Sequence, residues 1–264
     1  MESPGLHQRL INVVLTPSRA FDGFENGVTF KDWLYPMLIV IGVYLLVPQT
    51  FRDISFYEAE QRIIKTERAV LNNPDIPEEH LEKFKSRMAD AKEKIADAKE
   101  NPWAFRNLWG VLLLPVVFFV IISVFSLVLL MVGNFGFGGK AKFFQVFTVV
   151  TFSYIIGGSG ILLNMNPGVG TIELLVKTPM IIAKGSTNIM LSPGLLFDEL
   201  DSFLKHFVNQ FDLFRLWSVA IMGFGFAKLY DRSTAAGIVA VGLPWLIFTA
   251  VGAALQSSSG MTIA

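Results

Sequence analysis

The chain contains no cysteine among its 264 residues. This absence excludes disulfide bonds, thiolate metal sites, a thiol nucleophile and palmitoylation. Charge is also scarce, because 17% of the residues are Asp, Glu, Lys or Arg, against about 25% in a typical soluble domain. The 22 basic residues balance the 22 acidic ones, so no overall positive field favours nucleic acid as a partner. The composition points away from thiol chemistry and from nucleic-acid binding.

Apolar sequence is abundant, at 52% of the residues, and it gathers in five stretches. These cover residues 33–49, 108–133, 143–164, 213–227 and 235–255. A bilayer core about 30 Å thick requires roughly 20 apolar residues of helix. Backbone groups in lipid must be satisfied within helices or closed barrels, and these stretches are too long and too apolar for barrel strands. We therefore predict an all-α fold, a polytopic membrane bundle of five transmembrane helices with the lipid bilayer around it.

Residues 51–107, between the first two stretches, carry 11 of the 22 basic and 12 of the 22 acidic residues. Acids and bases alternate at helical spacing over residues 54–71 and 78–100, and the residues Asn-Asn-Pro-Asp-Ile-Pro at 72–77 break the helix and restart it. This pattern predicts a charged, extramembrane helical hairpin inserted between the first two spans. Spacing alone leaves two roles open for it, a docking arm for a partner and a passive linker.

Residues 166–211 form a second region without a spanning stretch. Within it, residues 171–182 are apolar but too short to span, and Pro179 interrupts them, which favours a re-entrant or interfacial piece. From Leu196 to Phe211, apolar residues recur at i, i+3, i+4 and i+7, as in an amphipathic interfacial helix before span four. Its polar face is acidic, which favours packing on the protein's own bundle over attraction to anionic lipid.

Residues 1–32 lack a cleavable signal pattern, because Pro17 and Arg19 interrupt their short apolar run. They are predicted to form N-terminal interfacial helices before a membrane domain over residues 33–264. Lysines and arginines near span ends favour the cytoplasmic side. By this rule we expect a cytoplasmic N-terminus and an extracytoplasmic C-terminus in a bacterial cytoplasmic (inner) membrane, with the charged hairpin outside.

Patterns of catalysis, cofactor binding and metal binding are not found in the sequence. The histidines His7, His80 and His206 are far apart and are not spaced as metal ligands. Residues 136–141 match a glycine-rich nucleotide fingerprint, but they follow an apolar helix rather than a buried strand. Ionisable residues at membrane depth mark transport pathways; the cores of the five stretches hold none, and Arg215 lies at the mouth of the fourth. We predict no catalytic residue, no cofactor, no metal and no enzymatic activity.

Small and mildly polar residues are the candidates for contacts between helices. Glycine allows close approach of helix backbones in a membrane, and the candidate packing positions are Gly157, Gly158, Gly160, Gly223 and Gly225. Polar side chains join helices by hydrogen bonds or line a solute path, and the candidates for either role are Gln145, Asn164 and Asn166. Bundle packing or homo-oligomerisation is the favoured interpretation of both sets.

Three local patterns resemble the Yip domain family, named from Ypt/Rab-interacting proteins, in its bacterial branch. The first is Leu-Thr-Pro-Ser-Arg-Ala-Phe at 15–21, followed by Trp33 and Pro36. The second is the glycine-then-lysine entry to the third stretch at 138–147, with Ser153 and Tyr154 following. The third is residues 212–218, with Asp212, Phe214 and Trp217, which lead to Gly223 and Gly225 and then to residues 233–236.

This resemblance covers most of the chain except the charged hairpin. It implies a five-span helical domain, an N-terminus inside the cell and no catalytic activity. Eukaryotic members bind Rab-type GTPases through acidic and tyrosine-rich N-terminal motifs that are missing here, so GTPase binding is not carried over. Some bacterial members are thought to assist exporter complexes.

Two functions follow from these patterns. The first is a non-catalytic integral membrane scaffold or assembly protein, exporter-related or trafficking-related, that docks an envelope or exporter protein through the hairpin. The alternative is a transporter or channel for a small neutral or lipidic solute, with Asn164, Asn166 and residues 157–160 lining its path.

Overall fold

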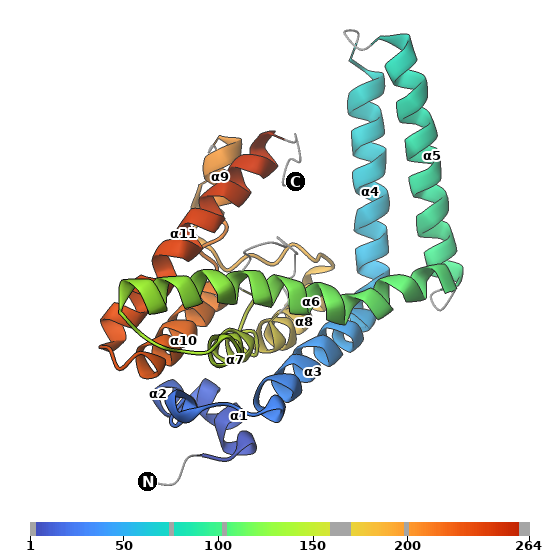
Figure 1. The fold of residues 1–264 in the computed structure, drawn as a ribbon. Helices are drawn as coiled ribbons and strands as arrows, with labels where there is room; N and C mark the ends of the chain where they lie inside the picture. The colour runs from blue at the N-terminus through green and yellow to red at the C-terminus, as the bar shows by residue number, and fades with distance from the viewer. Residues whose placement is uncertain (1–3, 74–76, 102–104, 159–169, 198–200, 259–264) are drawn as a thin grey trace.

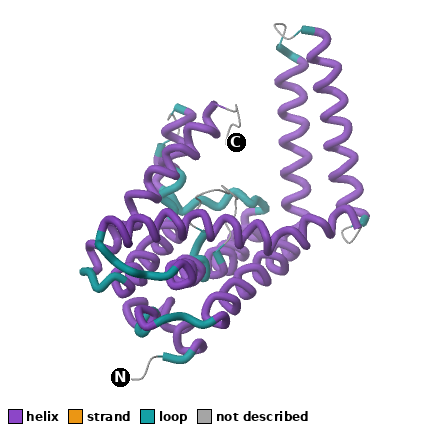
Figure 2. Tube along the Cα trace, in the orientation of Figure 1, coloured by secondary structure: helices purple, strands orange, loops and turns teal. Residues whose placement is uncertain are grey.

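The computed structural model describes residues 4–73, 77–101, 105–158, 170–197 and 201–258. These residues contain no strand, and Figure 2 shows helices joined by loops. The prediction of an all-α fold is therefore confirmed for this part of the chain. Among the described residues, three helices are long and apolar enough to cross a membrane: Phe30–Leu71, Leu112–Gly136 and Thr234–Ser257.

A bundle of apolar helices forms the body of the molecule (Figure 1). It is made of α3 (Phe30–Leu46), α6 (Phe105–Met131), α7 (Phe143–Ser153), α10 (Leu213–Leu229) and α11 (Thr234–Ser258). The core between these helices is rich in phenylalanine, and its fully buried members include Phe125, Phe147, Phe152 and Phe226. The outward faces of α6 and α11 expose leucine, isoleucine and valine, which is the pattern of helices surrounded by lipid.

Short helices close one end of this bundle. They are α1 (Leu6–Leu15), α2 (Pro17–Ala20) and the 3₁₀ turn η1 (Phe24–Asn26). The Gln145 side chain at the start of α7 donates to the carbonyl of Phe24 over 2.6 Å. Two further contacts lie at this end. Lys228 of α10 pairs with Asp22, between α2 and η1, at 2.8 Å, and Arg232, just after α10, donates to the carbonyl of Phe137, before α7, at 2.8 Å.

Two antiparallel helices project from the other end of the bundle (Figure 1). They are α4 (Arg52–Leu71) and α5 (Glu78–Glu100), and residues 52–100 are called the arm below. The helical backbone runs from α3 through the 3₁₀ turn η2 (Val47–Phe51) into α4. Ion pairs join the arm's helices, Glu60 to Lys99 at 2.5 Å and Glu67 to Lys92 at 2.6 Å. No side chain of α4 is buried.

The third predicted span differs most from the structure. Helix α7 ends at Ser153, so its 11 residues cover half of the stretch predicted over 143–164, and residues 159–164 lie outside the described part. The next described helix, α8 (Thr171–Lys184), corresponds to the segment predicted as re-entrant or interfacial. The other four apolar stretches match α3, α6, α10 and α11 within a few residues.

The predicted amphipathic helix before span four is shorter than its apolar pattern. The structure has a 3₁₀ turn, η4 (Pro193–Leu196), and a seven-residue helix, α9 (Ser202–Val208). Phe207 packs on Phe211, which packs in turn on Trp245 of α11. Leu196 and Phe197 are exposed. The apolar side chains of this segment therefore do not all face the bundle.

Candidate functional site

Helices α7 and α8 are joined end to end by their backbones. The amides of Thr171, Ile172 and Glu173 donate to the carbonyls of Tyr154, Ile155 and Ile156 at 3.1, 2.9 and 2.9 Å. Each bond joins residues 17 positions apart, whereas an α-helix joins residues four apart. The first amides of a helix have no partner within it, and here the preceding helix supplies them. The two helices therefore form one interrupted helix, and we call this junction the helix break.

Two glycines permit this junction. A Cβ atom on Gly170 would lie 2.1 Å from the Cα atom of Gly157. A Cβ on Gly157 would lie 2.5 Å from the carbonyl oxygen of Phe214, at the start of α10. Both neighbours are backbone atoms, which cannot rotate away as a flexible side chain can. The helix break therefore requires the absence of a side chain at both positions.

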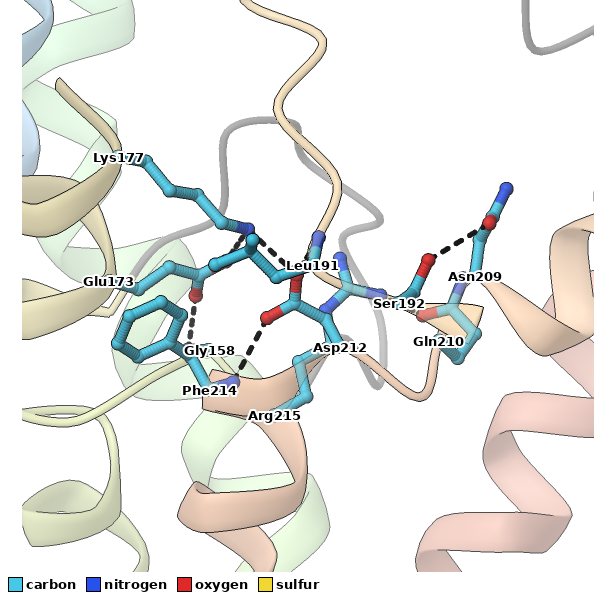
Figure 3. Close-up of polar contacts among 10 residues, drawn as sticks. All are labelled: Gly158, Glu173, Lys177, Leu191, Ser192, Asn209, Gln210, Asp212, Phe214 and Arg215. Carbon is cyan, nitrogen blue, oxygen red and sulfur yellow. Dashed lines mark hydrogen bonds and ion pairs between the residues drawn. The ribbon is translucent and has the colours of Figure 1, made fainter. Parts of the chain in front are cut away.

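Buried charges lie directly beside the helix break (Figure 3). The Lys177 ammonium pairs with Glu173 at 2.8 Å and with Asp212 at 3.0 Å. These side chains are almost fully buried, at 4%, 1% and 6% exposure for Lys177, Glu173 and Asp212. The other oxygen of Glu173 accepts the amide of Gly158, before the break, at 3.2 Å. We call Glu173, Lys177 and Asp212 the ion network.

Asp212 connects the ion network to two further segments. Its carboxylate caps α10 by accepting the amide of Phe214 at 3.0 Å, and it accepts the amide of Leu191 at 3.2 Å. An aspartate at this position satisfies an amide that the helix leaves without a partner. Beside it, the buried Arg215 donates to Gln210. Two acids and two bases are thus brought together, so the cluster has no net formal charge.

Helix α8 buries its charged side chains and exposes apolar ones, which is the reverse of a surface helix in water. Its inner face carries Glu173 and Lys177, whereas its outer face exposes Leu175, Val176, Met180 and Ile182. Charged residues are seldom fully buried unless paired, and an exposed apolar face is unfavourable in water. Both arrangements are favourable when the outer face contacts lipid, where charge turns toward the protein interior. The ion network thus lies on the buried face of α8, opposite an exposed apolar face whose composition suits contact with lipid.

The C-terminal end of α8 holds the base of the arm. Glu58 of α4 accepts hydrogen bonds from the Ser186 hydroxyl at 2.6 Å, from the Thr187 amide at 3.1 Å and from the Thr187 hydroxyl. Burial opposes the ionisation of Glu58, but these hydrogen bonds and the nearby Arg62 outweigh it and hold the pKa of Glu58 below its ordinary value. A hydrophobic cluster of Phe51, Leu174, Ile181 and Ile189 packs beneath this contact.

The glycines predicted for helix packing have different surroundings. A Cβ on Gly223 would lie 2.6 Å from Ile238 of α11, and one on Gly225 would lie 2.6 Å from Val149 of α7. These positions bring α10 close to its two neighbours. Gly157 lies at the helix break and Gly158 donates to Glu173, while Gly160 lies outside the described residues.

The residues predicted as polar contacts and as family-like motif residues also lie in different parts of the molecule. Gln145 binds the η1 turn at the far end of the bundle, and Asn164 and Asn166 lie outside the described residues. Asp212 belongs to the ion network, and the Phe214 ring lies 5.9 Å from the Lys177 ammonium. Trp217 is exposed on α10. The structure thus brings Asp212 and Phe214 into the site, without Gln145 or Trp217.

Sequence reasoning did not select Glu173 and Lys177. They lie four residues apart in a segment too short to count as a span, and Pro179 made a continuous crossing helix improbable. The signal was present in their spacing, because an acid and a base at i and i+4 inside an apolar segment can neutralise each other on one helix face. Their partner Asp212 is 35 residues away from Lys177, a contact that local patterns do not reveal.

Comparison with protein-family models, curated proteins and solved structures gave no match. Within the described residues, no three His, Asp or Glu side chains gather as a metal site would require.

Proposed function

We propose that the protein is a non-catalytic integral membrane scaffold or assembly protein of an envelope complex, exporter-related or trafficking-related, and that it docks partners through the arm. The observation that carries this proposal is the construction of the arm. Its helices expose most of their charged side chains, while its base is fixed to α8 through Glu58. An arm that is open to water along its length and held firmly at its base suits the presentation of a surface to another protein.

The proposal includes five membrane crossings. They are α3, α6, the interrupted helix α7–α8, α10 and α11, and the lipid-facing surface of α8 supports counting α7 and α8 as one crossing. With five crossings, the N-terminus and the linkers near Phe137 and Arg232 share one side, as their mutual contacts favour. The positive-inside rule makes that side cytoplasmic, which puts the arm and the C-terminus on the extracytoplasmic side of a bacterial inner membrane. The resemblance to the Yip domain family is part of the same proposal.

Removal of the outer arm tests the docking role. Glu60 and Lys99 form an ion pair between the two helices, so replacing residues 61–98 by a short glycine-serine loop shortens the arm and keeps Glu58 in place. We expect the shortened protein to keep its thermal stability in detergent and to lose the proteins that co-purify with it from native membranes. Retention of every co-purified protein would contradict the docking role.

A transport function is the second candidate, and the ion network at the helix break favours it. Ionisable residues at membrane depth often mark a path for a solute, and interrupted helices with sites at the break are typical of transporters. The solute class proposed here is small and neutral or lipidic. The test is flux of glycerol, and movement of a fluorescent phospholipid between leaflets, in vesicles containing the purified protein. Flux above that of protein-free vesicles, lost in a stable Glu173→Gln variant, would favour transport over the scaffold role.

A further inference from the structure

A groove lies between the two helices of the arm, in the half that is away from the bundle (Figure 1). Its volume is about 290 Å³, and its lining residues are Val70 of α4 and His80, Lys83, Phe84 and Arg87 of α5. The spacing of the four residues of α5 puts them within an arc of about 100° on the helix. The groove is therefore built by the end of α4 and by one face of α5.

The groove has an apolar part that the arm itself does not cover. Phe84 and Val70 are half-buried, and none of the described side chains of residues 52–100 is buried. Burying such surface against another apolar side chain is favourable by roughly 25 cal/mol for each Å² removed from water. The arm therefore has apolar contact area available at this place.

The rest of the groove lining is basic. Lys83, Arg87 and His80 are exposed, and no acidic residue of the described chain is among the lining residues. Glu82 and Asp90, two acids elsewhere on α5, already form ion pairs with other lysines of the same helix. The lining therefore has a positive formal charge at neutral pH, which comes from Lys83 and Arg87.

The distance of the groove from the bundle bears on what can occupy it. Val70 lies in the last turn of α4, whose 20 residues extend about 30 Å from the base of the arm. In the five-crossing arrangement this position favours a segment of another protein over the lipid headgroups around the bundle. An apolar floor with a positive rim is complementary to a segment that carries both apolar and acidic side chains.

We propose that this groove binds a segment of a partner protein in which acidic residues flank a large apolar side chain. The apolar side chain packs on Phe84 and Val70, and the carboxylates contact Lys83 and Arg87. The inference rests on the proposed function, in which the arm docks partners, and it adds the place of contact and the chemistry of the bound segment. Because the arm is extracytoplasmic in that proposal, the segment belongs to the extracytoplasmic part of an envelope protein.

Peptide selection tests the groove without knowledge of the partner. Random peptides displayed on phage are panned on the full-length protein in lipid nanodiscs, after removal of those that bind empty nanodiscs. The affinities of the selected peptides are then measured by fluorescence anisotropy at about 0.15 M salt, where exposed charges in contact still attract. We expect the selection to enrich peptides that combine Asp or Glu with Leu, Phe or another large apolar residue.

The variant Lys83→Glu with Arg87→Glu reverses the charge of the groove. We expect the selected peptides to bind it at least about tenfold more weakly than the wild type, because attractive contacts become repulsive. The matched control is Lys65→Glu with Arg68→Glu, which reverses the same number of exposed charges on α4 outside the groove lining and should leave the affinities unchanged. Circular dichroism checks that each variant keeps its helices.

Selected peptides that lack either acidic or apolar residues, or that bind both variants equally well, would overturn the inference. The docking role of the arm is judged by a different result, the loss of co-purifying proteins when residues 61–98 are replaced. Proteins that co-purify with the Lys83→Glu and Arg87→Glu variant, but not with the shortened protein, would leave the docking function intact and contradict this groove as its site.

Discussion

Two acid–base pairs at i and i+4 show how much surroundings change the effect of one side chain. Glu173 and Lys177 are 2.8 Å apart and nearly fully buried, whereas Asp90 and Lys94 are 2.6 Å apart and about 60% exposed. Exposed pairs contribute between 0 and about 1 kcal/mol, because water already solvates each charge. A buried acid left without its base retains an uncompensated charge.

Lys177→Met is therefore expected to lower the free energy of unfolding by about 3–5 kcal/mol, since Glu173 and Asp212 would then lose the ammonium that pairs with both of them. Lys94→Met, the control with the same spacing, should change it by less than about 0.5 kcal/mol. Denaturant titration in mixed micelles measures both values. Equal effects in the two variants would show that the ion network does not stabilise the fold.

Glycine at the helix break gives a second comparison. Gly170→Ala would place a methyl group 2.1 Å from the Gly157 backbone, and we expect destabilisation of at least about 1–3 kcal/mol, because backbone atoms cannot move aside without strain. Gly42→Ala in α3 meets no atom within 4 Å and should stabilise the helix by up to about 1 kcal/mol. Thermal unfolding in detergent distinguishes them. A stable Gly170→Ala variant would contradict the close junction.

At this scale the sequence drew attention to two residues of the site without predicting a role for them. Asp212 and Phe214 were named because residues 212–218 resemble a family pattern before an apolar helix. Glu173 and Lys177 did not, because their burial depends on the helix break, which forms between residues separated along the chain. Local spacing predicts which side chains share a helix face, but not which face the rest of the molecule covers.

Among the elements, the contact between the arm and α8 is sensitive to acid. The pKa of Glu58 is held below its ordinary value of 4.5 by hydrogen bonds from Ser186 and Thr187. A depressed pKa means that ionised Glu58 stabilises the folded state above pH 4.5, and that this stabilisation is lost as the pH falls through the lower folded value.

The Glu58→Gln variant makes this dependence measurable, because glutamine resembles the protonated acid. We expect the wild type to have a higher Tm than the variant at neutral pH, and the difference to shrink as the pH falls below 4.5. Glu82→Gln, in an exposed ion pair, serves as the control and should show little difference at any pH. A Tm difference for Glu58→Gln that is constant with pH would argue against this role.

Elements with strong local patterns were the most predictable. The boundaries of α3, α6, α10 and α11 follow from long apolar runs, and those of α4 and α5 from charge alternation around prolines. The prediction for residues 143–164 was wrong about helix length, because α7 ends at Ser153. Its apolar composition continues beyond that point, so composition gave no sign of the break. The backbone contact with α8 determines where the helix ends.

For the whole molecule, the absence of cysteine makes single-cysteine labelling a direct test of sidedness. Asn26 and Ser233 are exposed at one end of the bundle, and Gln61 and Lys184 at the end that carries the arm. With five crossings, Asn26→Cys and Ser233→Cys should react with an impermeant maleimide only after the membrane is opened, while Gln61→Cys and Lys184→Cys should react in spheroplasts. Labelling of Asn26 and Gln61 from one side would contradict the proposed topology.

The continuous helical path from α3 through η2 into α4 has a mechanical consequence. At about 1.5 Å per residue, the 17 residues of α3 and the 20 of α4 form two limbs of about 26 and 30 Å. Phe51 lies between them, buried against α8, and serves as a fulcrum. A sideways pull on the tip of the arm therefore tilts α3 through a lever of nearly equal limbs. Movement of the arm's tip would then be matched by an opposite movement of similar size at the start of α3.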